Sequence, residues 1–342
     1  MSDGRPGRRA RAYRARAGHR VRRRAKERAI STICLIADIG GTNARLALTG
    51  ADGRPSAEQR LRVADYPGPV EAARAYLAGR PVRQAVFAVA TPVTGDRVAL
   101  TNSHWVFSIE ETRAALGLDR LAVINDFTAQ ALAIPLLQDD ERRQIGDGAP
   151  EPGQAIGVIG PGTGLGVGGL LPIGDRWQAI PGEGGHVSLS PQDEVEDAIL
   201  VHLRRRFGHV SAERVLSGPG LINLATALAA IEGVELEIGD PQQVAERARS
   251  GECRFCSAAL GRFSAMLGAA AGDLALTLGA RGGIYIGGGL VKRLGELFDD
   301  ARFRAAFAAK GRLARFLVPI PTYLVTRRDP GLLGAAALAL AP

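Results

Sequence analysis

A strand–glycine turn–strand unit occurs twice in the sequence, and it constrains the fold more than any other feature. The first copy covers residues 32–48, with the tight turn at Gly40-Gly41. The second covers residues 155–171, with a glycine-rich turn at residues 160–166. Short apolar runs bounded by glycine predict buried strands. Because the unit recurs in the other half of the chain, we predict two related α/β halves that face each other.

The domain boundaries are predicted from composition. An apolar strand at residues 121–124 leads into Asn125-Asp126 and an amphipathic helix that Pro135 ends. The polar stretch at residues 138–153 is the best boundary inside the chain. Helices dominate from about residue 193 onward. We therefore predict a basic arm, a small α/β domain and a large α/β domain, over residues 1–29, 30–137 and 138–327.

The charge of the chain is concentrated at its start. The net charge is +8, but residues 1–30 alone hold eleven Arg and one Lys against Asp3 and Glu27, so the other 312 residues sum to −2. We expect the arm to be a solvated tail or an overlong start of the reading frame. Binding of this arm to nucleic acid or another polyanion is the alternative.

The remaining composition indicates a globular protein of a reducing compartment. Hydrophobic residues make up 46% and charged residues 23%, which excludes a wholly disordered chain. Three cysteines are too few for a disulfide scaffold. No apolar run reaches the ~18 residues that cross a bilayer, and the basic arm lacks the apolar core of a secretory signal. We therefore expect a cytoplasmic protein with no membrane partner.

Both glycine turns suit phosphate groups. Without a Cβ, a glycine lets backbone N–H groups approach an anion closely. The first turn adds the Asp38 carboxylate, which can hold hydrated Mg²⁺, and a hydroxyl at Thr42. The second supplies a hydroxyl but no carboxylate. Two such turns predict a nucleotide site, whereas one alone would favour a plain hairpin. The candidate residues are Asp38, Gly40, Gly41, Thr42, Gly162, Thr163 and Gly164.

Three competing motifs fail on context. Gly164-x-Gly166-x-x-Gly169 matches the dinucleotide fingerprint, but it leads into a strand where that motif needs a helix. The Gly-x-x-x-x-Gly-Lys-Ser/Thr pattern of a P-loop is absent from the sequence. Cys253-x-x-Cys256 lacks the two further ligands of a zinc site, so we interpret it as two buried thiols.

Six motifs in order give the chain a family resemblance. Together they resemble the bacterial glucokinase family, in the superfamily of actin, hexokinase and the heat-shock chaperone ATPases. The resemblance runs from about residue 32 to the C-terminus and includes the glycine segment 283–289 and DPGLLG at 329–334. The six motifs are DIGGTNAR at 38–45, TNxxW at 101–105, NDF at 125–127, GTGLG at 162–166, GEGGH at 182–186 and ERVLSG at 213–218.

The resemblance implies the roles of individual residues. Asp126 matches the catalytic base, and Gly287 and Gly288 match the adenosine-side glycines. A sugar site needs carboxylates, amides and a histidine, because each sugar hydroxyl both donates and accepts. From the residues alone, Asp126 also suits the N-cap of the next helix, and His186 suits a structural histidine. The implied sugar ligands are Asn102, Asn125, Asp126, Glu183, His186 and Glu213.

The implied fold is α/β, a two-domain ribonuclease H-like ATPase of the actin/hexokinase type with a cleft between the domains. Its C-terminal helix, residues 328–342, would pack back on the small domain. The implied reaction is the Mg²⁺-dependent transfer of the ATP γ-phosphoryl group to the 6-hydroxyl of glucose, at the entry to glycolysis. We also expect a homodimer.

Two other functions stay open at this point. One is a kinase for another hexose or an amino sugar, or one that uses polyphosphate. The other is a sugar-sensing regulator built on a kinase fold, with the basic arm on DNA. A helix-turn-helix domain does not fit into residues 1–29, and the carboxylate at Asp126 favours catalysis.

Overall fold

The computed structural model describes residues 33–50 and 52–340. The predicted basic arm, residues 1–29, lies outside them. The described residues form two compact units, the first of residues up to Ala129 together with those from Pro330, and the second of residues 130–329. The boundary between the two units after Ala129 lies eight residues before the predicted one, and the polar stretch at residues 138–153 folds in the second unit.

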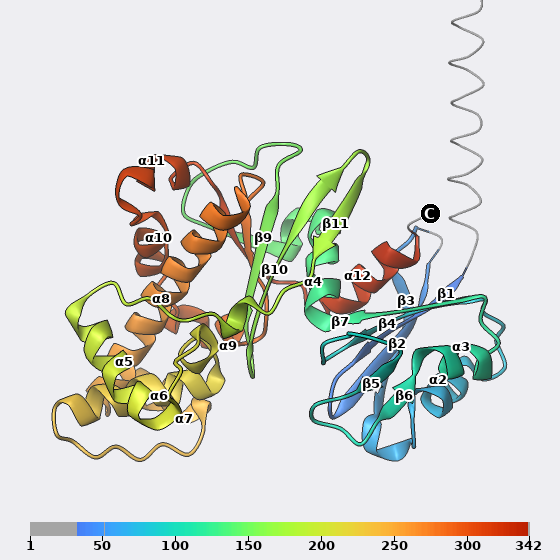
Figure 1. The fold of residues 1–342 in the computed structure, drawn as a ribbon, viewed down its shortest axis with the longest axis horizontal. Helices are drawn as coiled ribbons and strands as arrows, with labels where there is room; N and C mark the ends of the chain where they lie inside the picture. The colour runs from blue at the N-terminus through green and yellow to red at the C-terminus, as the bar shows by residue number, and fades with distance from the viewer. Residues whose placement is uncertain (1–32, 51, 341–342) are drawn as a thin grey trace, which may run out of the picture. The chain divides into compact units, whose positions relative to one another are not determined.

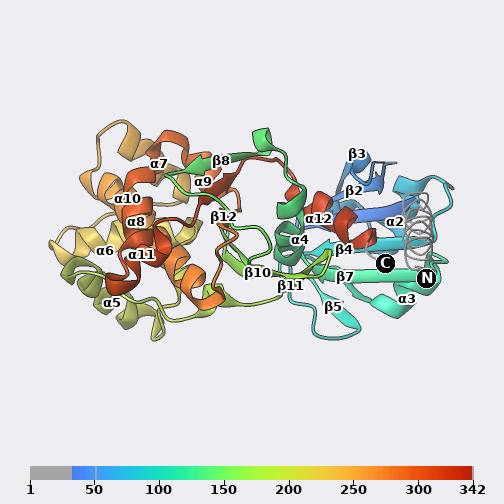
Figure 2. The ribbon, with the colours of Figure 1, turned by 90° about the horizontal axis from the view of Figure 1, so that it is seen from above.

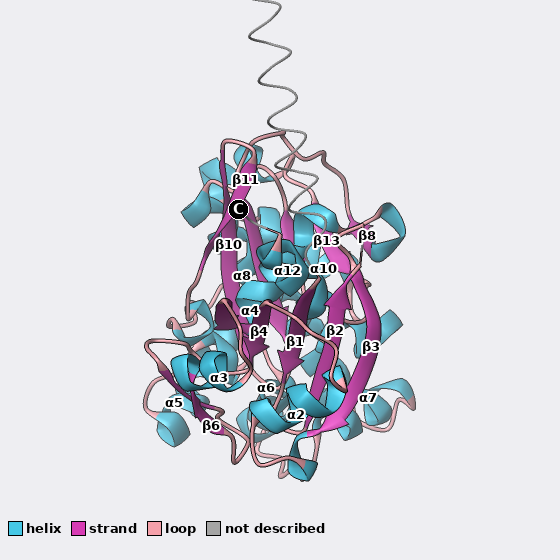
Figure 3. Ribbon diagram, turned by 90° about the vertical axis from the view of Figure 1, so that its right-hand side faces the viewer, coloured by secondary structure: helices cyan, strands magenta, loops and turns pink. Residues whose placement is uncertain are grey.

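The first unit is built on a five-stranded sheet of order β3-β2-β1-β4-β7 (Figure 3). β1, β4 and β7 are parallel, β2 runs antiparallel to β1, and β3 runs antiparallel to β2. A separate hairpin pairs β5 with β6. The strands are β1 (Cys34–Ile39), β2 (Asn43–Thr49), β3 (Pro55–Arg62), β4 (Gln84–Val89), β5 (Arg97–Ala99), β6 (Val106–Ser108) and β7 (Arg120–Asn125).

Both faces of this sheet are covered, which explains why β1 is a continuous apolar run. Leu35, Ala37 and Ile39 point into a core with α2 (Pro69–Leu77) and Trp105. Ile36 points to the opposite face, against the C-terminal helix α12 (Pro330–Ala339). The C-terminal helix thus lies on the small α/β unit. The other helices of this unit are α3 (Ile109–Ala115) and the start of α4 (Asp126–Ala133).

The second unit repeats the strand order of the first. Its sheet runs β11-β10-β9-β12-β13-β8 (Figure 1). In the first sheet β1 forms a hairpin with β2, β3 extends that hairpin, and β4 and β7 add in parallel on the other side of β1. In the second sheet β9, β10 and β11 take the places of β1, β2 and β3, and β12 and β13 take those of β4 and β7. The prediction of two related halves is confirmed. The strands are β8 (Arg142–Ile145), β9 (Ile156–Pro161), β10 (Leu165–Ile173), β11 (Arg176–Ile180), β12 (Ile284–Ile286) and β13 (Thr322–Val325).

The polar stretch at residues 138–153, predicted as the domain boundary, supplies β8, the sixth strand of this sheet. β8 pairs antiparallel with β13, and the Thr322 hydroxyl donates a 2.6 Å hydrogen bond to the Ile145 carbonyl. Ile145 is the single buried residue of β8, and the other three residues are Arg142, Arg143 and Gln144, so this edge strand looks polar in sequence.

Helices pack against this second sheet and one another (Figures 1 and 2). The Ala-rich helix α8 (Arg254–Leu278) is the central one and contacts α6, α7 and α10. Gly268 and Gly272 let α10 approach it, since a Cβ at Gly268 would lie 2.1 Å from the Phe303 carbonyl oxygen. The remaining helices are α5 (Glu194–Phe207), α6 (Gly218–Ile231), α7 (Pro241–Arg249), α9 (Leu290–Leu294), α10 (Asp300–Ala308) and α11 (Ala314–Leu317).

Candidate functional site

Three neighbouring parallel strands of the first unit end in register. Ile39 of β1 pairs with Val89 of β4, which pairs with Asn125 of β7. The carboxyl edge of a parallel sheet is where an α/β fold collects its functional groups. Asp38 and Asp126 therefore lie on this edge, two strands apart, and the charge of Asp38 acts on Asp126.

Asn125, and not Asp126, caps helix α4. Its Oδ1 accepts hydrogen bonds from the backbone N–H groups of Phe127 at 2.9 Å and Thr128 at 3.3 Å. Its Nδ2 donates to the Thr91 carbonyl at 3.3 Å. The interpretation of Asp126 as the N-cap is therefore corrected: the preceding amide occupies that role, and Asp126 is the first residue of α4.

The Asp126 carboxyl has a raised pKa of about 6. Removal from water is the main cause, and the negative charge of Asp38 adds to it, while hydrogen bonds with Phe127 and Asn125 oppose the shift. A carboxyl that titrates near neutral pH both loses and accepts a proton readily, which suits a general base. The geometry of the strand edge thus gives Asp126 the property that its predicted role requires.

Asp38 is held by groups that the sequence prediction did not include. Arg45, its direct cross-strand partner on β2, lies 3.4 Å away. Gly331 at the start of α12 also packs against Asp38, because a Cβ there would lie 3.1 Å from the Asp38 Cγ. At Gly334 a Cβ would lie 1.6 Å from the Ala129 carbonyl oxygen. The glycines of the DPGLLG motif therefore allow α12 to approach the site residues.

Asn102 lies directly against the first glycine turn. A Cβ at Gly41 would be 2.5 Å from the Asn102 carbonyl oxygen. Trp105 anchors the loop, since it is fully buried and its indole N–H donates to the Tyr66 carbonyl at 2.9 Å. The turn itself is closed by a 2.9 Å hydrogen bond from Gly40 N–H to the Asn43 carbonyl. Thr42 beside it is exposed. The first unit thus gathers one half of the predicted residues.

The second glycine turn is tied to the start of α6. Gly162 N–H donates to the Gly164 carbonyl at 2.8 Å, and Gly218 N–H donates to the Gly162 carbonyl at 2.8 Å. The side chain of Ser217 caps α6 by accepting from Gly220 N–H at 3.1 Å. Thr163, at the tip of the turn, is exposed. The N-terminal end of a fourteen-residue helix therefore adjoins the predicted phosphate turn.

Glu213 joins the predicted sugar ligands to this turn. Its Oε2 accepts a 2.9 Å hydrogen bond from Leu165 N–H. A Cβ at Gly164 would lie 2.4 Å from the same oxygen, so a side chain at this position would displace the Glu213 carboxylate or the turn. Glu213 belongs to the 3-10 turn η5 (Ala212–Arg214).

Glu183 immediately precedes a second 3-10 turn, η4 (Gly184–His186), and His186 is the last residue of that turn. His186 N–H donates to the Glu183 carbonyl at 2.9 Å, and both residues are exposed. A Cβ at Gly185 would lie 2.0 Å from the Leu165 carbonyl oxygen, so this turn packs tightly on β10. η4 contacts η5, which brings the segments of Glu183, His186 and Glu213 together.

The adenosine-side glycines lie at the same sheet edge as the second glycine turn. β12 is parallel to β9, and Gly287 N–H donates to the Ile159 carbonyl at 2.8 Å. Gly288 has a φ of +71°, and a Cβ there would lie 2.3 Å from the Pro161 carbonyl oxygen. Both conditions require glycine.

A cavity of about 760 Å³ opens beside the second glycine turn and is large enough for a nucleoside. Gly162 and Thr163 form one wall, and α6, α7 and α9 form the others. The sequence prediction missed its polar residues on α7 and α9, because isolated charges on amphipathic helices look like solvated faces. These residues are Gln242, Glu246, Arg249 and Arg293.

The comparisons with known proteins agree with this arrangement. The family model described as Glucokinase matches residues 35–341. The chain belongs to the glucokinase family. It is 48% identical to the glucokinase of Paramagnetospirillum magneticum over 92% of this chain and 99% of that protein. It is also 49% identical to the bifunctional protein glk of Burkholderia orbicola over 89% of this chain, but it spans only 48%, about half, of that longer relative.

Among solved structures, the glucokinase from an Antarctic psychrotroph matches with a TM-score of 0.84 and 39% identity, over 90% of this chain and 98% of that one. The α/β fold of the actin/hexokinase type that the motifs implied is thereby confirmed. Within the described part of the chain, no helix has the length and apolarity needed to span a bilayer.

The structure also bears on the competing motifs of this glucokinase-family chain. Gly166 and Gly169 lie within strand β10, so the dinucleotide fingerprint indeed leads into a strand. Cys253 and Cys256 are both buried, and the Cys253 Sγ caps α8 by accepting from Cys256 N–H at 3.2 Å. Burial, with the neighbouring Cys253, raises the pKa of the Cys256 thiol to about 12.

Proposed function

We propose that the chain transfers the γ-phosphoryl group of ATP to the 6-hydroxyl of glucose. The observation that carries this proposal is Asp126, a carboxyl with a pKa of about 6 on a strand edge, fixed by the Asn125 cap. Phosphoryl transfer needs an oriented hydroxyl, a base and donors around the phosphates, and little covalent chemistry from the protein. Asp126 accepts the proton of the 6-hydroxyl while the hydroxyl oxygen attacks the γ-phosphorus of ATP.

The proposed sugar ligands are Asn102, Asn125 and Asp126 of the first unit and Glu183, His186 and Glu213 of the second. Because the Asn125 Oδ1 already accepts two backbone hydrogen bonds, it is the Nδ2 group that faces a sugar hydroxyl. A charged carboxylate that accepts from a hydroxyl contributes about 1.5–3 kcal/mol, which makes Glu183 and Glu213 the main determinants of affinity.

The nucleotide occupies the second unit's cavity with its phosphates toward the glycine turn. Gly162, Thr163 and Gly164 supply the turn, the N-terminal end of α6 supplies a favourable dipole, and Gly287 and Gly288 lie under the nucleoside. The 760 Å³ volume and its contact with Thr163 support this assignment. From the first unit, Gly40, Gly41 and Thr42 approach the phosphates.

Asp38 is the residue proposed to hold Mg²⁺ through water. The residues fit a divalent cation, because Asp38 and Asp126 repel each other strongly enough to raise the Asp126 pKa, and a cation relieves that repulsion. Arg45, 3.4 Å from Asp38, orients the carboxylate. Mg²⁺ supplies neutralisation of the charge that develops on the phosphates.

A panel of sugars and phosphoryl donors tests the proposal. Formation of the phosphorylated sugar is followed by a coupled assay with glucose, mannose, fructose and glucosamine, each with ATP or polyphosphate. We expect glucose with ATP to give the highest kcat/KM. A higher value with another pair would replace glucose or ATP in the proposal. Absence of turnover with every pair, together with saturable sugar binding, would instead support a regulator.

Assembly and location complete the proposal. A homodimer is the proposed assembly, as expected from the sequence. Light scattering with size-exclusion chromatography measures the mass. Because ATP and reducing conditions coincide in the cytoplasm, we place the enzyme there, where its product enters glycolysis.

A further inference from the structure

A second cavity lies in the second unit, behind the segments that carry the predicted sugar ligands. Its volume is about 220 Å³. The walls come from β9, β10, the segment after η4, η5 and α8, and they share no residue with the nucleoside-sized cavity. Most of the lining is apolar, and its members include Ile159, Leu165, Leu189, Met266, Ala270 and Leu274.

One buried carboxylate faces this apolar space. Glu196, in the first turn of α5, lines the cavity and is only 3% exposed. Asp273 also lines it, but that residue is held by Lys310 Nζ at 2.7 Å and its side chain is 57% exposed. Burial of a charged group is unfavourable unless hydrogen bonds satisfy it, so the partners of Glu196 decide what the cavity can bind.

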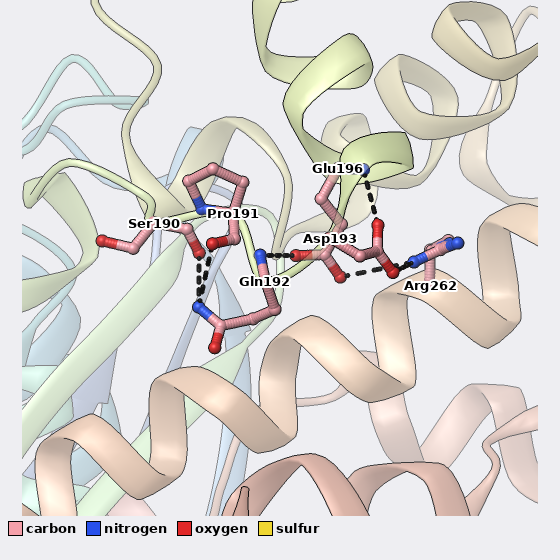
Figure 4. Close-up of polar contacts among 6 residues, drawn as sticks. All are labelled: Ser190, Pro191, Gln192, Asp193, Glu196 and Arg262. Atoms are coloured by element: carbon pink, nitrogen blue, oxygen red, sulfur yellow. Dashed lines mark hydrogen bonds and ion pairs between the residues drawn. The ribbon is translucent and has the colours of Figure 1, made fainter. Parts of the chain in front are cut away.

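The hydrogen bonds of Glu196 use only one of its carboxylate oxygens (Figure 4). Oε2 accepts from Gln192 N–H at 2.9 Å. Asp193 caps α5 by accepting from Glu196 N–H at 2.9 Å, and it also receives the hydrogen bond from Arg262. Oε1 forms a longer ion pair with Arg262 Nη1, at 3.7 Å. Within residues 33–50 and 52–340, no hydrogen bond ends on Glu196 Oε1.

We propose that this cavity binds a compact, mostly apolar molecule with one hydrogen-bond donor, an amine or a hydroxyl, that donates to Glu196 Oε1. A dry apolar cavity of about 150 Å³ can bind benzene, so 220 Å³ suits one six-membered ring with a short substituent. The hydrogen bond from Gln192 uses Oε2, and the 3.7 Å ion pair with Arg262 leaves Oε1 able to accept a hydrogen bond. The carboxylates of Glu196 and Asp273 disfavour acids.

The position of the cavity gives its occupant a route to the sugar ligands. Gly184 and Val187 line it beside His186, and Ala212 lines it beside Glu213. Leu165, whose N–H donates a hydrogen bond to Glu213, also lines the cavity. Binding itself depends only on the cavity, so its test is independent of the kinase reaction.

The chain offers a direct probe of this cavity. It contains two methionines, Met1 and Met266, and Met266 lines the cavity at 1% exposure. A full-length chain labelled with ¹³C at the methionine methyls gives two signals, which Met266→Leu assigns. Benzylamine and benzyl alcohol are the donor-bearing probes, and toluene is the matched ring without a donor. We expect a saturable shift of the Met266 signal alone, with toluene bound at least tenfold more weakly than benzylamine.

Two substitutions separate the cavity from its polar anchor. Ala270→Leu fills the space and should abolish the shift, whereas Ala258→Leu, on an exposed part of α8 outside the cavity, should leave it intact. In Glu196→Gln the amide oxygen takes the hydrogen bond from Gln192, so an N–H group faces the cavity. Benzylamine should then bind at least fivefold more weakly and toluene equally well.

Three results would overturn the proposal. They are an unmoved Met266 signal at millimolar probe, a shift that persists in Ala270→Leu, and equal affinities for toluene and benzylamine. If Ala270→Leu fails to fold, the comparison of toluene with benzylamine and the affinities measured in Glu196→Gln still test the proposal.

Discussion

Glu213 Oε2 accepts a 2.9 Å hydrogen bond from the backbone N–H of Leu165, the first residue of β10. This contact ties a proposed sugar ligand to the strand that leaves the proposed phosphate turn. Gly164 packs against the same oxygen. A displacement of Glu213 is therefore expected to affect the binding of both substrates, even though its own proposed partner is the sugar.

Glu213→Gln should raise the KM for glucose about tenfold and lower kcat less. The amide oxygen can still accept from Leu165 N–H, so folding survives, but the charged acceptor of a sugar hydroxyl is lost. Steady-state kinetics and the melting temperature measure the two effects. Glu235→Gln, in an exposed loop, is the matched control. An unchanged KM in the folded variant would remove Glu213 from the sugar site.

Gly164→Ala should raise the KM for both glucose and ATP at least fivefold. The new Cβ would lie 2.4 Å from Glu213 Oε2, so the carboxylate or the turn must move. Gly95→Ala is the control, because a Cβ at Gly95 meets nothing within 4 Å. Kinetics with each substrate varied in turn give the two constants. If only the ATP constant changes, Glu213 is not the link between the two segments.

The value of kcat/KM for glucose should rise with pH through about 6 and level off above pH 7. A general base acts in its deprotonated form, and kcat/KM reports the pKa of the free enzyme, which is about 6 for Asp126. A pH series from 5 to 8 at constant ionic strength measures this limb. A limb centred near pH 4, the ordinary range of a carboxyl, would exclude Asp126 as the titrating group.

Removal of residues 2–29 should leave kcat, both KM values and the melting temperature nearly unchanged. The family model matches residues 35–341, and every candidate residue lies within that range. Kinetics of the truncated chain beside the full chain make the comparison. Loss of activity would mean that the arm contributes to the site, and a salt-sensitive loss of DNA binding would support the regulator function.

The fold was predictable where local patterns and tertiary structure agree. The apolar run of β1 reflects a strand covered on both faces. Ser108 caps α3 by accepting from Glu111 N–H at 3.1 Å, which agrees with the Ser-x-x-Glu pattern of residues 108–111. β8 was missed because one buried side chain on an edge strand leaves no apolar pattern. Its position depends on pairing with β13, which is far away in the sequence.

The site was predictable as motifs but not as contacts. Arg45 lies inside the DIGGTNAR motif, and the hairpin register that the glycine turn implies would have paired it with Asp38. The contact of Glu213 with Leu165 joins residues 48 positions apart, so no local pattern indicates it. The 220 Å³ cavity is lined by six segments, β9, β10, the η4 segment, α5, η5 and α8, and its existence depends on how their side chains pack.

Asp126→Asn provides the decisive test of the mechanism. Asn cannot accept the proton of the 6-hydroxyl, and general-base assistance is worth roughly 10²–10⁴-fold, so kcat should fall at least ~100-fold. Folding should survive, because Asn125 and not Asp126 caps α4. Glucose binding should stay within about tenfold, since one hydrogen bond changes its partner type while the others remain. A coupled assay measures turnover, and a fluorescence titration measures binding.

The same variant has a stability signature that a merely structural residue would not give. The folded-state pKa of Asp126, about 6, lies above its ordinary value of 3.8, so the folded protein binds the proton more tightly than the unfolded chain does. The contribution of Asp126 to stability is therefore greatest below pH 4 and declines as the pH rises through about 6. A shift of two pKa units corresponds to at most about 3 kcal/mol. Asp126→Asn removes this decline, so its melting temperature should exceed that of the parent at pH 7 and the gain should vanish below pH 4. A folded variant that turns over within about tenfold of the parent, and melts with it at every pH, would mean that Asp126 is neither buried as a charge nor the base.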